Sequence, residues 1–277
     1  MLPWLTALLV LFVSSLYFPF HSNSHVLLDQ ARSNASRILL LTAHPDDECL
    51  FFAPTVLALR EHPAHPEIFS LTLSIGNAAG FGEVRKEELS RSLDVMGIDQ
   101  DNRWVVDHPM LQDNMTLEWD ASVIAVVIAP YVVDNHITTI LTFDTQGISS
   151  HPNHYSLPFG AWDLANILRA KAPEPTSFSV PRVFSLVTVP LLSKYAGVLA
   201  PLSSRMNMIL QRVLNRFTQS DGNQQAVFTS GFTQYVTAVR AMQKHTTQLE
   251  WFRYLYVTFS RYMWINDWVE VKSLGKN

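Results

Sequence analysis

The run RILLLT at residues 37–42 constrains the fold of this 277-residue chain more than any other segment. A short run of consecutive apolar residues bounded by polar ones is typical of a strand that is buried on both faces, as in a parallel sheet. The same β-then-α order recurs along the chain, and strands in that order are joined by right-handed crossovers. We therefore expect an α/β fold with a Rossmann-like, mostly parallel sheet flanked by helices. The expected strands are 37–42, 68–75, 104–106, 138–143 and 183–189, and the expected helices are 49–60, 83–96, 119–133 and 153–171.

The amino-terminal segment from Leu2 to Phe20 has no charged side chain, and the first charged side chain is that of Asp29. About 20 apolar residues span the roughly 30 Å core of a bilayer. We expect a single-pass transmembrane anchor rather than a cleaved signal peptide, because a basic n-region and a clear cleavage site are missing. Arg32 and Arg37 follow this segment and only the terminal amine precedes it, so the positive-inside rule predicts a domain on the cytosolic side.

These features divide the chain into an anchor at 1–22, a linker at 23–36 and a globular domain at 37–277. Glycosylation sequons at Asn34 and Asn114 would be usable only if the domain were lumenal. The only cysteine, Cys49, cannot form an internal disulfide, which favours a reducing compartment. The chain has 20 basic and 24 acidic residues and no long block of like charge, so nucleic acid is not an expected partner.

Two further segments of the carboxyl-terminal half are rich in apolar residues. Residues 187–202 contain two prolines, a glycine and a lysine, so contact with a membrane surface or simple burial is expected in place of a membrane span. Residues 248–263, QLEWFRYLYVTFSRYM, predict an aromatic-rich helix. Its Arg253 and Arg261 either hold acidic headgroup oxygens or line a solvated face.

A candidate metal site follows the first buried strand. His44 and Asp47 stand three residues apart across a predicted strand-to-helix turn, and an N/O ligand pair of this kind suits Zn²⁺. The segment from His151 to His154 supplies a third ligand, because it follows another predicted strand end and can meet the first loop at the same edge of the sheet. Two histidines and one aspartate leave a coordination position for water, whose proton a nearby carboxylate can take. The alternatives are ordinary ones: a surface or core histidine, and an acidic run that caps a helix.

Three motifs carry a family resemblance, and together they span about residues 38–160. The motifs AHPDDE at 43–48, GNAAGFGEVRKEEL at 76–89 and SSHPNH at 149–154 resemble those of the PIG-L/LmbE family of zinc deacetylases. The resemblance departs from the usual pattern at Ala79, where relatives often carry an acidic residue, and at Ser150, where glycine is usual. These departures concern substrate contacts and not the proposed metal ligands.

The resemblance implies roles for seven residues of this chain. It implies that His44, Asp47 and His154 bind the metal, that Asp46 is the general base, and that His151 polarises the amide carbonyl or stabilises the oxyanion. It also implies that Arg85 binds substrate and that Glu88 orients Arg85. The alternative for the last two is an exposed i,i+3 ion pair on a helix, which contributes little energy.

The carboxyl-terminal segment is similar to the eukaryotic, fungal-type branch of this family. That similarity implies a hydrolase of a linear amide which uses water activated by Zn²⁺, or by another divalent ion, to remove the N-acetyl group of N-acetylglucosaminyl-phosphatidylinositol. It also implies work at the cytosolic face of the endoplasmic reticulum membrane during GPI-anchor biosynthesis, with a glycolipid substrate and membrane lipids as partners. Two alternatives stay open: a deacetylase of another N-acetyl amino sugar in the lumen or outside the cell, and a non-catalytic lipid- or sugar-binding membrane protein.

Overall fold

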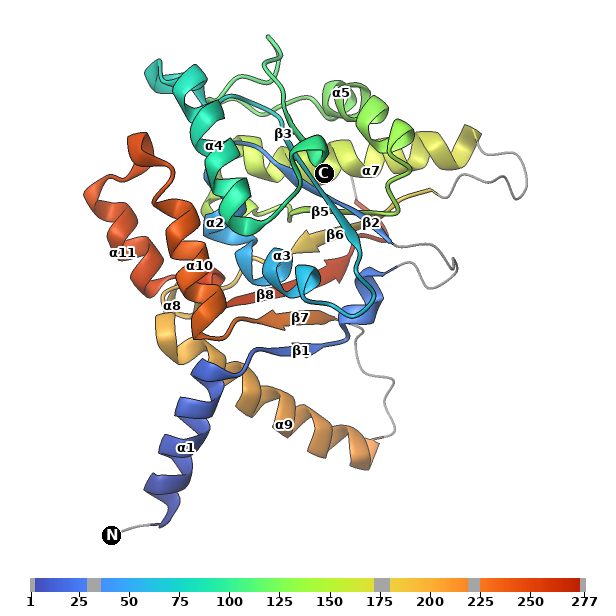
Figure 1. Cartoon of the computed structure of the whole chain (residues 1–277). Coiled ribbons are helices and arrows are strands. Elements are labelled where there is room, and N and C mark those ends of the chain that lie inside the picture. Colours follow the sequence, from blue (N-terminus) through green and yellow to red (C-terminus); the bar gives the residue numbers. More distant parts are fainter. Residues whose placement is uncertain (1–2, 29–35, 172–179, 219–224, 275–277) are drawn as a thin grey trace.

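The computed structural model describes residues 3–28, 36–171, 180–218 and 225–274, of which 3, 4, 8 and 211–218 are described by their backbone alone (Figure 1). Its centre is one eight-stranded sheet in the order β1-β7-β8-β6-β5-β2-β3-β4. The strands are β1 Phe20–Ser22, β2 Arg37–Thr42, β3 Glu67–Thr72, β4 Arg103–Val105, β5 Thr139–Phe143, β6 Arg182–Leu186, β7 Ala226–Thr229 and β8 Ile265–Glu270.

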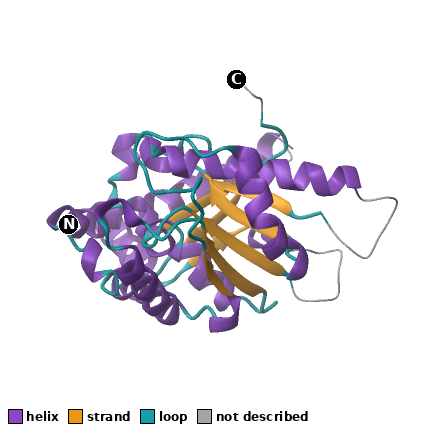
Figure 2. Ribbon diagram, turned by 90° about the horizontal axis from the view of Figure 1, so that it is seen from above, coloured by secondary structure: helices purple, strands orange, loops and turns teal. Residues whose placement is uncertain are grey.

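Helices cover both faces of this sheet (Figure 2). Helices α5 and α7 pack together, with α7 on β2, β5 and β6, while α3 packs on β3, β7 and β8 from the other face and contacts α2, α4 and α10. The α-helices are α1 Pro3–Tyr17, α2 Asp47–Phe51, α3 Ala53–Arg60, α4 Gly82–Met96, α5 Ala121–Asp134, α6 Gly147–Ser150, α7 Pro152–Lys171, α8 Leu191–Lys194, α9 Ala200–Thr218, α10 Phe232–Met242 and α11 Trp251–Phe259. Short 3₁₀ helices are η1 Ser24–Leu27, η2 Asn77–Ala79, η3 Gln100–Asn102, η4 Gly197–Leu199, η5 Thr246–Gln248 and η6 Arg261–Met263.

The predicted α/β class is confirmed, but the sheet is mixed. The neighbours β6, β5, β2, β3 and β4 are all parallel, and β2 is wholly buried from Ile38 to Thr42, as its apolar run predicted. The remaining strands β8, β7 and β1 join antiparallel and were not predicted. Strand β8 escaped prediction because its sequence INDWVE mixes polar and apolar residues, and the side chain of the buried Asn266 bonds Thr55 and Phe51, which are more than 200 positions away.

The amino-terminal segment differs from the expected span of residues 2–20. Its helix α1 ends at Tyr17, because Pro19 has no N–H to continue the helix and Phe20 already pairs with Thr229 in the sheet. Leu27, which the sequence placed in a linker, is fully buried in the core. Among the residues that the structure describes, none of the helices combines the length and the apolar character needed to cross a bilayer.

The parallel half of the sheet contains a topological switch point between β2 and β5. From β2 the chain crosses to β3 and then β4 on one side, whereas from β5 it crosses to β6 on the other side. Loops that leave the carboxyl ends of two such strands diverge and leave a crevice, where open α/β sheets bind their ligands. The motif AHPDDE, which contains His44, follows β2, and the motif SSHPNH, which contains His154, follows β5, so both predicted loops start at this crevice.

Candidate active site

The side chains of His44, Asp47 and His154 meet at the switch point, and all three are buried. The distance from Nδ1 of His44 to Nε2 of His154 is 3.2 Å, and Nε2 of His154 lies 3.2 Å from Oδ1 of Asp47. Nδ1 of His44 lies 3.8 Å from Oδ2 of Asp47. Tetrahedral zinc with bonds of about 2.0–2.1 Å has ligand atoms roughly 3.3 Å apart. The spacing of the three side chains therefore fits a metal ion.

The hydrogen bonds around the two imidazoles also favour a metal ion. Nε2 of His44 lies 3.1 Å from Oδ1 of Asn153 and 3.3 Å from Oδ1 of Asp113, so this nitrogen carries the proton. Nδ1 of His154 lies 3.3 Å from the carbonyl oxygen of Gly147 and carries the proton there. Each ring then turns its lone pair toward the other ring and toward a carboxylate. A cation between them relieves this repulsion.

The carboxylate of Asp47 is held in place by the backbone of its own loop. Its Oδ2 accepts hydrogen bonds from the backbone N–H groups of Ala43 at 3.0 Å and His44 at 2.9 Å. Burial alone would raise the pKa of Asp47, but the neighbouring His154 and His44 and these hydrogen bonds hold the pKa well below its ordinary value. Asp47 is therefore an ionised ligand in a fixed orientation.

Asp46 lies beside these three residues with its backbone in the left-handed region, at φ 101°. A side chain rarely adopts this conformation, and the buried carboxylate of Glu48 holds it by accepting a hydrogen bond from the N–H of Asp46 at 3.0 Å. Burial raises the pKa of Asp46, although the guanidinium groups of Arg253 and Arg85 oppose the rise. Asp46 thus combines the position and the weak acidity expected of a general base.

His151 points into the same site from the start of α7. Its Nδ1 accepts a hydrogen bond from the N–H of Asn153 at 3.2 Å, so Nε2 carries the proton of the neutral ring. Burial, together with the neighbouring His154 and His44, lowers the pKa of His151 to about 4. The ring can therefore donate a hydrogen bond from Nε2 while it is neutral at pH 7.

Arg85 reaches the site from α4, and its guanidinium bonds protein backbone. It donates to the carbonyl oxygens of Gly76 at 2.8 Å and Pro45 at 2.7 Å, and its Nη1 lies 3.5 Å from Oδ2 of Asp113. Gly76 has φ 68°, and a Cβ there would lie 2.4 Å from the guanidinium, so this glycine makes room for Arg85. Arg85 therefore positions the turn that carries Asp46.

Glu88 does not orient Arg85 as the sequence implied. Its carboxylate accepts hydrogen bonds from the hydroxyl of Thr246 at 2.5 Å, from the N–H of Thr247 at 2.8 Å and from the hydroxyl of Thr247 at 2.6 Å. Both Arg85 and Glu88 are buried, so the exposed ion pair considered for them is also wrong. The carboxylate of Glu88 joins α4 to η5 because these two elements pack together in the fold.

Two residues of the site, Asp113 and Arg253, were not assigned to it from the sequence. Asp113 lies in the loop after β4 and approaches His44, Arg85 and His151. The signal for it was weak: an acidic residue in a loop that follows a parallel strand. Arg253 donates from Nη2 to Oδ2 of Asp46 at 2.8 Å. The sequence left open whether this arginine faces solvent, and the structure turns it toward the site.

The loop before His151 is strained. Gly147, Ile148 and Ser150 have φ values of 60°, 61° and 57°, which side chains rarely adopt. Ser150 replaces the glycine that is usual in the resembling family, and its positive φ explains why glycine suits that position. The turn delivers His151 and His154 from the end of β5 to the metal ligands on β2.

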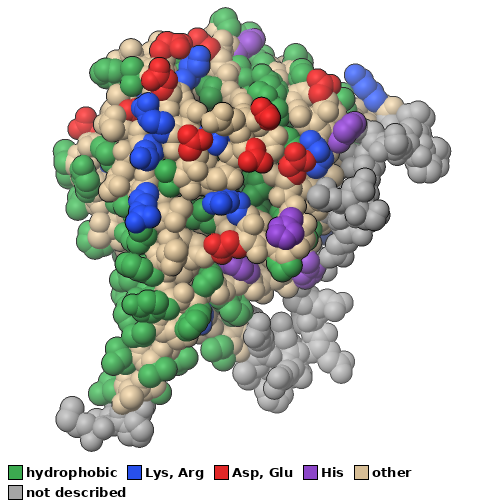
Figure 3. All heavy atoms as spheres, viewed as in Figure 1, with side chains coloured by type: hydrophobic (Ala, Val, Ile, Leu, Met, Phe, Trp, Pro, Cys, Tyr) green, Lys and Arg blue, Asp and Glu red, His purple; other side chains and the backbone are tan. Residues whose placement is uncertain are grey.

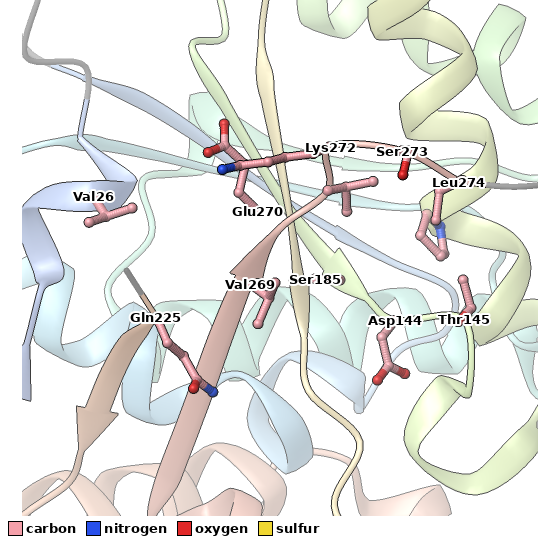
Figure 4. Close-up of a pocket in the computed structure, with 12 residues that line it drawn as sticks. Val26, Asp144, Thr145, Ser185, Gln225, Val269, Glu270, Lys272, Ser273 and Leu274 are labelled. Carbon is pink, nitrogen blue, oxygen red and sulfur yellow. The ribbon is translucent and has the colours of Figure 1, made fainter. Parts of the chain in front are cut away.

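A separate cavity of about 420 Å³ is lined by a different set of residues, among them Asp144, Glu270 and Lys272 (Figure 4). Asp144 and Glu270 are the acidic residues in its lining, and both are already bonded. Asp144 accepts from the N–H and hydroxyl of Thr188, and Glu270 accepts from Arg182. The cavity therefore does not contain a competing set of catalytic groups.

Comparisons with known proteins agree with the motifs. Residues 39–165 match the family model described as "PIG-L: GlcNAc-PI de-N-acetylase". The chain is 38% identical over 232 residues to the N-acetylglucosaminyl-phosphatidylinositol de-N-acetylase of Bos taurus, which covers 84% of this chain and 82% of that protein. It is 32% identical over 257 residues to a probable enzyme of the same name in Dictyostelium discoideum, covering 85% and 93% of the two chains.

Among solved structures, a deacetylase of the teicoplanin biosynthesis pathway shares the fold. The TM-score is 0.56 at 11% sequence identity, with 86% of this chain and 100% of that chain covered. At 11% identity this neighbour shows only that the fold is shared, whereas the two sequence relatives are similar enough in sequence to show common ancestry. The chain therefore belongs to the PIG-L family of GlcNAc-PI de-N-acetylases.

Proposed function

We propose that this protein hydrolyses the N-acetyl group of N-acetylglucosaminyl-phosphatidylinositol, giving acetate and glucosaminyl-phosphatidylinositol, in the second step of GPI-anchor biosynthesis. One observation carries the proposal: the imidazole lone pairs of His44 and His154 converge with the Asp47 carboxylate beside Asp46 and His151. The names of the sequence relatives support the substrate.

The metal at this site is proposed to be zinc, although another divalent ion also fits an N/O ligand set. His44 Nδ1, Asp47 and His154 Nε2 would hold it. When bound, it would supply a Lewis acid that lowers the pKa of a water molecule and polarises the amide carbonyl. Three protein ligands leave a position open, which is typical of catalytic zinc sites and not of structural ones.

The protein's own groups then perform the proton transfers. The carboxylate of Asp46 takes a proton from the attacking water, and the Arg253 side chain keeps that carboxylate oriented through the 2.8 Å contact. The Nε2–H of His151 donates a hydrogen bond to the carbonyl oxygen, where negative charge develops. That Arg85 binds substrate stays a prediction, because its guanidinium already positions the Pro45 turn.

We further propose that the protein works at the endoplasmic reticulum membrane with its catalytic domain on the cytosolic face, attached through the apolar segment 2–20. The support is the uncharged segment itself, followed by Arg32 and Arg37. The sequon at Asn34 lies outside the described residues. The sequon at Asn114 adjoins Asp113, and the N–H of Asn114 bonds Asn153, so a glycan there would crowd the site. This crowding favours the cytosolic placement.

The direct test is acetate release by the purified full-length protein in detergent from N-acetylglucosaminyl-phosphatidylinositol. Release should stop with a chelator and return when zinc is added, and reloading with other divalent ions ranks the metals. Asp46→Asn should keep bound zinc but lose most turnover, by about a hundredfold or more. The exposed Asp101 provides the matched control, since Asp101→Asn should change neither property.

Two results would contradict the proposal. If folded, metal-loaded protein releases no acetate, the proposed activity is refuted and the non-catalytic lipid-binding alternative is favoured. Full turnover in Asp46→Asn would refute the assigned base.

A further inference from the structure

Helix α11 exposes five large apolar side chains. Residues 253, 256, 257 and 260 face the protein, at the spacing of one helical stripe. The ring of Tyr256 lies 5.7 Å from that of Phe51, and Arg253 reaches Asp46. The outward face instead carries Trp251, exposed to 72%, together with four more exposed large apolar side chains, Phe252, Tyr254, Leu255 and Phe259. A helix that faces water would have the opposite arrangement.

The outward face of α11 continues onto neighbouring elements. η4 contacts both α11 and α9, and α9 packs against α1. Gly197 of η4 has φ 51° and approaches Phe259 so closely that a Cβ would lie 3.2 Å from its Cα. The exposed large apolar residues of α8, η4, α9 and α1 include Leu191, Leu192, Leu199, Ile209, Leu9 and Val10. We call the exposed side of α1, α8, η4, α9 and α11 the apolar face.

Apolar side chains gather on this part of the surface in the space-filling view, whereas acidic side chains gather on the upper part (Figure 3). Figure 1 shows α1 projecting from the same end of the molecule at which α8 and α9 lie, with α11 along the adjoining side. Exposed large apolar side chains therefore gather on one side of the protein, and such a gathering marks a surface that binds a membrane or another protein.

The charge of these segments identifies the partner. Residues 1–28, 187–218 and 251–263 contain no acidic residue, in a chain with 24 acidic residues. Their basic residues are Lys194, Arg205, Arg212, Arg216, Arg253 and Arg261. Arg253 and Arg261 form ion pairs with Asp46 and Asp267. Lys194 and Arg205 instead donate to the backbone carbonyl oxygens of Ile148 and Phe18, which do not neutralise their positive charge. Apolar side chains with tryptophan, tyrosine and basic residues suit an anionic lipid surface.

We propose that the apolar face docks on an anionic phospholipid bilayer, with the aromatic side of α11 in the interfacial region. Because Arg253 on the inward side of this helix contacts Asp46, docking places the metal site at the lipid surface. A headgroup that stays in its membrane can then reach the site. The docking itself is independent of the proposed reaction, and its benefit to turnover rests on the proposed function.

The test places a fluorescent reporter on each side of the molecule. Cys49 is buried, so a thiol-reactive, environment-sensitive dye would label an introduced surface cysteine selectively. Leu255→Cys reports from α11, and Val126→Cys is the matched control, since Val126 is exposed to 72% on α5. Both positions are exposed, so neither change removes core packing. The full-length protein is mixed with vesicles of phosphatidylcholine alone or with phosphatidylinositol added.

The dye at position 255 should brighten and shift to shorter wavelength with the anionic vesicles, and do so less with neutral ones. The dye at position 126 should not respond. An unchanged signal at 255, or equal responses at both positions, would overturn the proposal. Equal responses of the 255 dye to both vesicle types would overturn the anionic preference. A shift at 255 that grows with protein concentration before vesicles are added would assign the face to a second copy of the chain.

A second measurement concerns turnover. The measured quantity is the rate of hydrolysis of the lipid in vesicles divided by the rate for its water-soluble headgroup. In the double variant Trp251→Ser, Leu255→Ser this ratio should be about tenfold or more below that of the unchanged protein. An unchanged ratio would overturn the link between docking and turnover. A dye response at 255 without acetate release from either substrate would support docking and refute the proposed function. Acetate release without a dye response at 255 would support the proposed function and refute docking.

Discussion

Replacing His245 by leucine should leave the Glu48 carboxylate buried without a counter-ion. Both side chains are completely buried, and Nε2 of His245 lies 2.7 Å from Oε1 of Glu48. Burial would lower the pKa of His245, but the Glu48 charge raises it above its ordinary value. The same carboxylate accepts from the Ser92 hydroxyl at 2.5 Å and from the N–H of Asp46 at 3.0 Å. The pair therefore supports the strained turn that carries the proposed base.

The loss of folding stability in His245→Leu depends on how many hydrogen-bond partners the Glu48 carboxylate keeps. Removing one partner of a buried ion pair costs about 3–5 kcal/mol. Ser92 and the Asp46 N–H still stabilise the carboxylate, so we expect the lower end, about 3 kcal/mol, which is roughly a hundredfold in the folding equilibrium constant. Adding Glu48→Gln removes the buried charge and keeps an amide acceptor. The double variant should therefore recover at least about 1 kcal/mol relative to His245→Leu.

The assay is urea unfolding of metal-free protein with a chelator, because bound metal would add its own stabilisation. Fluorescence of the buried Trp264 and Trp268 reports the transition. The exposed His25 is the matched control, and His25→Leu should stay within about 0.5 kcal/mol of the unchanged protein. A loss below about 1 kcal/mol in His245→Leu, or no recovery in the double variant, would refute the reasoning about the buried charge.

Three other changes test separate contacts. Gly76→Ala should displace Arg85 and lower acetate release by about tenfold or more, whereas Gly80→Ala, which meets open space at a similar φ, should retain most activity. Asp113→Asn should weaken zinc binding by about 10- to 100-fold, because the carboxylate of Asp113 orients the imidazole of the proposed ligand His44. Zinc affinity is measured by competition with a chelator, and an unchanged affinity would refute that role. Glu270→Gln should cost less than about 1 kcal/mol at neutral pH, since its ion pair with Arg182 is partly exposed. The Arg182 hydrogen bond holds the pKa of Glu270 below its ordinary value, so this stability is present above that value and is lost as pH falls through the lowered pKa. Unfolding curves of the two proteins should converge in acid, and a constant difference would contradict the ion-pair account.

Much of the parallel half of the fold could be predicted because its signals are local. The strand at 37–42 is a short apolar run, and the residues from His44 to Asp47 belong to the turn that follows it. The helix predicted over 49–60 is in fact the two helices α2 and α3, with a break at Phe52. The break was not predicted because the apolar residues before and after Phe52 are all buried in the core, so the apolar pattern continues through it.

The contacts that complete the site depend on residues far apart along the chain. Arg253 and Asp46 are separated by 207 positions, and His245 and Glu48 by 197. No short-range pattern specifies which arginine or histidine approaches a given carboxylate. Asp113 joins the site only because the loop after β4 returns across the sheet edge to His44.

The sequence by itself determined the parallel strands, the order of the ligand-bearing loops and the uncharged amino-terminal segment, because each depends on neighbouring residues. Only the tertiary structure decided which imidazole nitrogens face one another and which side of α11 faces out. Hydrophobic spacing predicts a helix, but the side that turns inward is fixed by what the helix meets. Here Arg253 turns inward because the carboxylate of Asp46 lies there, and the aromatic side chains are left on the surface.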